Sequence, residues 1–126
     1  EELIVVEYKS QANSRPVTTE YYLARVYHQG YKIQLDFYAY LLTKMGFHVS
    51  PTGYFYVCNA DRAKSNFGGQ MTFDETLIPY TWNVTWIDPK VSEMINVLNS
   101  CDLPDHNPSC ENCAYAHRRA SMERMD

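Results

Sequence analysis

A glutamate and a lysine stand two residues apart at the end of an apolar run near the start of the sequence. The run reads "LIVVEYKSQ" and contains Glu7 and Lys9. In an extended strand, residues two apart project from the same face, so the carboxylate and the amine lie side by side. A carboxylate can bind a divalent cation, while a lysine amine can orient an attacking water and stabilise negative charge on a phosphate. The alternative is a structural ion pair on a half-exposed strand, which is a common arrangement.

A second pair of polar residues lies in a segment with helical periodicity. The stretch "YKIQLDFYAYLL" carries Gln34 and Tyr38, four residues apart. Residues at this spacing lie one above the other on a helix face. By itself, the pair also fits the polar boundary of an amphipathic helix. A strand with E-x-K, a helix with Q-x-x-x-Y, an aromatic hairpin and a terminal C-x-x-C form an unusual combination.

The C-terminal tail contains three cysteines that can act as metal ligands. Cys110 and Cys113 have C-x-x-C spacing, and Cys101 can join them as a third ligand after a loop. His106 or His117 can complete a zinc site. The other interpretation is that these cysteines are reduced thiols without a metal.

Composition limits the class of protein. The sequence has 126 residues, 45% of them hydrophobic, which is enough for one core and predicts a single domain. The net charge of -4 argues against a surface coated in basic residues, although a local basic groove remains compatible with it. No apolar run reaches the roughly 18 residues of a membrane span, and the first residues do not read as a signal peptide. We therefore expect a cytoplasmic protein with no membrane partner.

These residues must be positioned by an alternation of strands and helices. The pattern predicts a strand over Leu3–Ser10, a loop over Gln11–Thr19 and a helix over Tyr21–Met45, which Gly30 can interrupt and Gly46 ends. The remaining predicted elements are strands over Gly53–Asn59 and Met71–Trp82, a helix over Val91–Leu98 with Asp88 as N-cap, and a short final helix. Cys58 is expected to be a buried apolar position in its strand.

Taken together, these motifs resemble the C-terminal half of a RecB-like nuclease domain of the PD-(D/E)XK superfamily. The resemblance runs over most of the chain, from "LIVVEYKSQ" through "IQLDFYAYLL" and "TGYFYVCNA" to "CENCAYAHRR". It implies an α/β fold with a restriction-endonuclease-like mixed central sheet flanked by helices, present as a partial domain. Residues 1–100 would form the nuclease core, and residues 101–126 its cysteine-bearing tail.

The resemblance also implies a function. Glu7 would bind Mg²⁺ or Mn²⁺, Lys9 would be catalytic, and Gln34 and Tyr38 would line the DNA path. The chain would then belong to a metal-dependent DNA nuclease, in particular an exonuclease, and its partners would include DNA and other DNA-repair, recombination or phage-defence proteins. One alternative is an inactive nucleic-acid-binding or interaction module with the same fold. A third interpretation is a structural domain stapled by zinc at its tail cysteines.

The sequence departs from the family pattern in its acidic residues. The family places a metal-binding aspartate on the strand before E-x-K, and often a histidine farther upstream. The aspartates of this sequence follow the motif, among them Asp36, Asp61, Asp74 and Asp88, so none of these four fits by order. We therefore expect the chain to be part of a larger protein and to have little activity alone, because a magnesium site needs several oxygen ligands.

The cysteines also differ from the family pattern. Many members hold an iron-sulfur cluster with four cysteines, one of them far upstream. Here Cys101, Cys110 and Cys113 would supply three ligands, so the fourth would come from outside this sequence.

Other polar and aromatic residues are weaker candidates. His28 is expected at the core boundary or in solvent. The aromatic residues Tyr54, Tyr56, Trp82 and Trp86 suit either base stacking or core packing. The candidate phosphate contacts are Lys9, Arg15, Lys32, Lys44, Arg118 and Arg119.

Overall fold

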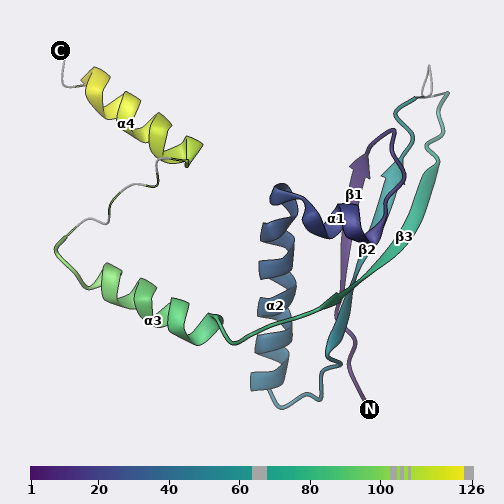
Figure 1. Cartoon of the computed structure of the whole chain (residues 1–126), viewed down its shortest axis with the longest axis horizontal. Coiled ribbons are helices and arrows are strands. Elements are labelled where there is room, and N and C mark those ends of the chain that lie inside the picture. Colours follow the sequence, from purple (N-terminus) through teal and green to yellow (C-terminus); the bar gives the residue numbers. More distant parts are fainter. Residues whose placement is uncertain (64–67, 103–104, 106, 108, 124–126) are drawn as a thin grey trace. The chain divides into compact units, whose positions relative to one another are not determined.

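The protein is described by a computed structural model that covers residues 1–63, 68–102, 105, 107 and 109–123. The chain forms two compact units, Glu1–Asp88 and Pro89–Asp126. The described residues form one three-stranded sheet and four α-helices, so the fold is mixed α/β (Figure 1). The predicted functional boundary at residues 100 and 101 stays a prediction.

The sheet combines one parallel and one antiparallel pair of strands. Its strands are β1 (Val6–Ala12), β2 (Thr52–Ala60) and β3 (Phe73–Thr81), in the order β1-β2-β3. β1 runs parallel to β2, while β3 runs antiparallel to β2. All three predicted strands are present with shifted ends. β1 begins later than expected because Leu3 forms only an isolated bridge, with Val49.

The connection from β1 to β2 is helical, as parallel strands require a crossover. It consists of α1 (Thr19–Ala24), the 3₁₀ turn η1 (Val26–His28) and α2 (Gln29–Lys44). The prediction of one helix over Tyr21–Met45 is therefore wrong. The break does not fall at Gly30, which lies inside α2.

The helix breaks at Arg25. This residue has extended backbone angles, φ -72° and ψ 133°, which interrupt the helical hydrogen-bond ladder. The carbonyls at the end of α1 then need other partners. His28 supplies one, because its Nδ1 lies 2.7 Å from the Tyr22 carbonyl oxygen and donates to it.

Gly46 ends α2 as the sequence predicts. Its φ of 91° is favourable for glycine and strained for other residues. The Gly46 N–H donates to the Thr43 carbonyl at 3.0 Å, and the Phe47 N–H donates to the Leu42 carbonyl at 3.1 Å. These two bonds form a Schellman motif, which satisfies carbonyls that the helix end leaves free.

The core lies between the crossover helices and one face of the sheet. Leu35 and Ala39 of α2 are fully buried, as are Phe55 and Val57 of β2 and Ile78 of β3. Packing here is close: a Cβ at Gly53 would lie 2.8 Å from Leu35 Cδ2 and 3.0 Å from the Val5 carbonyl oxygen. Cys58 is buried, as predicted.

Helix α3 (Ile87–Leu98) begins one residue before Asp88. Asp88 therefore lies in the first turn, and the prediction that it is the N-cap is wrong. Its carboxylate instead accepts a hydrogen bond from the Tyr40 hydroxyl and lies 3.9 Å from Lys44 Nζ. The carboxylate is thus engaged by side chains of α2.

The second unit contains α4 (Glu111–Glu123), which corresponds to the predicted final helix. Within the described residues, no helix is both long enough and apolar enough to cross a membrane.

Candidate active site

The Glu7–Lys9 pair lies on the covered face of β1. Lys9 Nζ donates to Glu7 Oε1 at 2.8 Å, and the side chains are only 18% and 16% exposed. The strand register places Glu7 beside Phe55 and Lys9 beside Val57, both of which belong to the core face. Each charge has therefore lost much of its hydration, and removing one would leave the other half-buried without its partner. This arrangement differs from an exposed surface ion pair.

Helix α2 brings Gln34 to the same lysine. Lys9 Nζ donates to Gln34 Oε1 at 2.9 Å, a contact between residues 25 positions apart. Gln34 Nε2 in turn donates to the Tyr38 hydroxyl at 2.6 Å. The structure thus joins Glu7, Lys9, Gln34 and Tyr38 in one continuous polar chain from β1 to α2.

Tyr31 completes the surroundings of Lys9. The Lys9 amine lies 4.2 Å from the centroid of the Tyr31 ring, which is close enough for a cation–π interaction. Sequence reasoning did not assign Tyr31 to the site. Its position three residues before Gln34, hence on the same helix face, was the signal that could have found it.

The neighbouring aspartates have structural roles or lie elsewhere. Asp36 is 4% exposed, and its carboxylate accepts from the Asn83 N–H at 3.0 Å and from the Trp86 indole at 2.9 Å. Asp61 and Asp74 line a depression near the end of β1 that does not include Glu7. Asp36 is therefore not a free metal ligand, although it follows Gln34 closely in the chain.

The described part of the chain contains no group of three His, Cys, Asp or Glu side chains that could hold a metal ion. Glu7 can supply one carboxylate ligand, but a hard cation such as Mg²⁺ requires more oxygen donors. The residues present thus fit one part of a metal site, and its remaining ligands would come from water, substrate or other protein groups.

The tail cysteines are only partly brought together. The Cys113 N–H donates to Cys110 Sγ at 3.5 Å, which lowers the pKa of the Cys110 thiol. The hydrogen bond between the two side chains raises the pKa of Cys113. Cys101 is exposed and does not complete a three-residue ligand group with them. His106 lies outside the described residues, and metal binding by the tail remains a prediction.

No family model, curated protein or solved structure matches this chain. The RecB-like resemblance therefore stays a prediction.

Two aromatic residues near the site, His28 and Tyr22, were not predicted to belong to it. His28 is buried at 8% exposure, and its ring stacks on Tyr31 with centroids 5.1 Å apart. Tyr22, also unassigned, packs against His28 with centroids 4.0 Å apart. The three-residue spacing of His28 and Tyr31 is compatible with their contact on one helix face, whereas the six-residue spacing of Tyr22 and His28 is not helical and their contact depends on the break at Arg25.

The other candidate phosphate contacts are not part of the polar chain. Lys44 is near Asp88, while Arg118 and Arg119 lie on exposed positions of α4 in the second unit. Arg15 lies in the loop after β1 and lines a small pocket together with Arg25.

Proposed function

We propose that this chain contributes the E-x-K and Q-x-x-x-Y part of a metal-dependent nuclease that hydrolyses phosphodiester bonds in DNA, as an exonuclease within a larger protein. The observation that carries the proposal is the simultaneous contact of Lys9 with Glu7 and Gln34. A structural ion pair on a strand would not require a glutamine from a separate helix at hydrogen-bond distance. This convergence supports a built polar site.

Each side chain of the site has a role that follows from its chemistry. Glu7 supplies one oxygen ligand to Mg²⁺ or Mn²⁺, which would activate water and stabilise charge on the phosphate. The Lys9 amine stabilises negative charge that develops on the phosphate and on the attacking oxygen. Gln34 holds the amine in place, and Tyr38, which is 38% exposed, offers its hydroxyl toward the DNA strand.

The alternative is a nucleic-acid-binding module that has the fold without the chemistry. It is favoured by one observation: the described residues, Glu7 included, form no group of three His, Cys, Asp or Glu side chains that could hold a metal ion. An acidic ligand elsewhere in the complete protein would support the enzyme.

Metal binding at Glu7 can be tested on this chain itself. Mn²⁺ broadens the NMR signals of nearby nuclei, so we expect it to broaden the amide signals of Glu7, Lys9 and Gln34 selectively. Glu7→Gln should remove this effect, whereas Glu93→Gln, on α3, should leave it unchanged. Equal broadening in wild type and Glu7→Gln would argue against Glu7 as the ligand.

Cleavage is tested in the complete protein with end-labelled DNA and Mn²⁺. Wild type should cleave, and Lys9→Ala should cleave more slowly by a factor of about 10² or more. Metal binding at Glu7 without cleavage in the complete protein would favour the binding module.

A further inference from the structure

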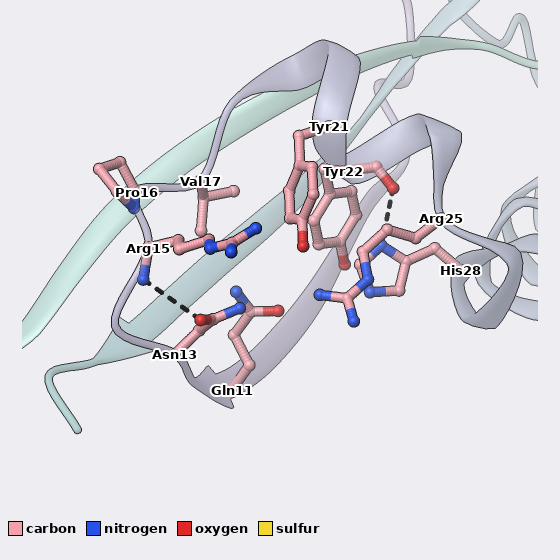
Figure 2. A pocket seen from close by; sticks show the side chains of 9 residues that line it. All are labelled: Gln11, Asn13, Arg15, Pro16, Val17, Tyr21, Tyr22, Arg25 and His28. Carbon is pink, nitrogen blue, oxygen red and sulfur yellow. Dashed lines mark hydrogen bonds between the residues drawn. The ribbon is translucent and has the colours of Figure 1, made fainter.

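A small pocket adjoins the candidate active site on the same face of β1. Gln11, the next residue after Lys9 on that face, lines it together with Arg15, Tyr21, Tyr22, Arg25 and His28 (Figure 2). Its enclosed volume is about 10 Å³, room for one oxygen-sized group. Figure 2 shows the hydroxyls of Tyr21 and Tyr22 and the guanidinium groups of Arg15 and Arg25 pointing toward the middle of the group of lining residues.

The Tyr22 hydroxyl is the unusual feature of this pocket. Tyr22 is 2% exposed, and its hydroxyl has no hydrogen-bond partner among the described residues. Buried hydroxyls are normally paired, so an unpaired one requires an explanation. Burial raises its pKa to about 12, with smaller contributions from Tyr31 and Glu7. The group therefore stays protonated at neutral pH and is available as a donor.

Among the described residues, the two arginines of the pocket also have no acidic partner. No carboxylate of the described residues lies within 4.0 Å of either guanidinium. Arg25 lies over the Tyr21 and Tyr27 rings, 5.3 and 5.9 Å from their centroids, which leaves its N–H groups free for an anion. Arg15 is exposed and also lines the neighbouring depression that contains Asp61 and Asp74. Two guanidinium groups with no acidic partner among the described residues, beside one buried donor, favour an anionic ligand with several acceptor oxygens.

We propose that this pocket binds a phosphate group of a nucleic-acid strand, adjacent to the phosphate held at Lys9. One oxygen enters the enclosed space and accepts from Tyr22, and the other oxygens face Arg15 and Arg25 at the mouth. The identification of the phosphate as part of a nucleic acid rests on the proposed function. The inference that the ligand is a phosphate group depends only on the residues of the pocket.

The position of the pocket suits a neighbouring phosphate of the same strand. Lys9 and Gln11 are two residues apart on β1, about 6.6 Å along the strand, which is comparable to the spacing of consecutive phosphates. A row of aromatic rings also joins the two places. Lys9 lies over Tyr31, Tyr31 stacks on His28, and His28 packs on Tyr22.

The test is a titration of the chain with inorganic phosphate, without divalent metal, followed by the amide NMR shifts of residues 11–28. We expect saturable shifts in wild type and roughly tenfold weaker binding in Tyr22→Phe, because a hydrogen bond to a charged group is lost. Arg15→Gln/Arg25→Gln should weaken binding further. Lys90→Gln, on α3, serves as the matched control for charge and should bind as wild type does.

A second titration with a short single-stranded oligodeoxynucleotide identifies the source of the phosphate. Tyr22→Phe should weaken the binding of both inorganic phosphate and the oligonucleotide. Shifts with inorganic phosphate but none with the oligonucleotide would overturn the nucleic-acid assignment in favour of free phosphate. No shift in wild type, equal binding in the variants, or loss of binding in Lys9→Ala alone would overturn the pocket.

These outcomes are independent of cleavage. Phosphate binding that depends on Tyr22 and persists in Lys9→Ala supports the pocket even if the complete protein cleaves nothing. Conversely, Mn²⁺-dependent cleavage with unchanged phosphate binding in Tyr22→Phe supports the nuclease and overturns the pocket.

Discussion

The amine of Lys9 lies 2.9 Å from the side-chain carbonyl of Gln34, although the two residues are 25 positions apart. The same amine lies 2.8 Å from Glu7 Oε1. One cation thus links strand β1 to helix α2, and its removal should affect both stability and function.

Replacement of Lys9 by methionine should destabilise the fold by about 1–2 kcal/mol, because the half-buried Glu7 carboxylate loses its partner. Lys44→Met is the matched control: its pair with Asp88 is 62% and 67% exposed, so the loss should stay below about 1 kcal/mol. Glu7→Gln/Lys9→Met should recover part of the loss. Urea unfolding gives the free energy of unfolding of wild type and of the three variants. Equal losses of this free energy in Lys9→Met and Lys44→Met would contradict a half-buried pair.

In the complete protein, Lys9→Ala should lower metal-dependent DNA cleavage by a factor of about 10² or more, since the lost charge acts mainly on the transition state. The circular dichroism spectrum should remain that of a folded protein. Cleavage at the parental rate under saturating Mn²⁺ would mean that Lys9 has no catalytic role.

Tyr22→Phe should leave the free energy of unfolding unchanged or raise it by about 1 kcal/mol. The substitution removes a buried hydroxyl that has no partner among the described residues, and it keeps the ring that fills the core. Tyr22→Ala is the contrasting variant and should cost about 3–5 kcal/mol through the cavity it leaves. A clear destabilisation by Tyr22→Phe would indicate that the hydroxyl has a structural partner.

Two glycine-to-alanine variants should shift stability in opposite directions. Gly53→Ala should cost about 1–3 kcal/mol, because the new methyl group would meet Leu35 Cδ2 at 2.8 Å. Gly30→Ala should stabilise by about 0.5–1 kcal/mol, since Gly30 lies inside α2 with open space around its Cβ position. Thermal unfolding of both variants tests the packing of α2 on the sheet. A neutral Gly53→Ala would argue against that close approach.

Iodoacetamide should alkylate Cys110 at lower pH than Cys113. The hydrogen bond from the Cys113 N–H lowers the pKa of Cys110, so more thiolate is present at a given pH, and the pKa of Cys113 is raised. Mass spectrometry after brief exposure at several pH values gives the two rates. In the complete protein, bound zinc or an iron-sulfur cluster would protect both cysteines, and elemental analysis distinguishes that case.

The sequence alone determined which groups share a face of each element. Alternation in the first strand put Glu7 and Lys9 side by side, and the four-residue spacing put Gln34 above Tyr38. The glycine at position 46 predicted the end of α2 because its positive φ is costly for other residues. These features depend on local geometry, which a short stretch of sequence fixes.

The tertiary structure decided which faces meet. The parallel pairing of β1 with β2 requires a crossover, and packing of α2 on the sheet brings Gln34 to Lys9. The helical periodicity did not predict the break at Arg25, because burial of Tyr22 and His28 outweighs local helix propensity. No sequence pattern predicted the pocket lined by Tyr22, Arg15 and Arg25. Its residues come from a loop, a short helix and a bend, and only long-range packing holds them together.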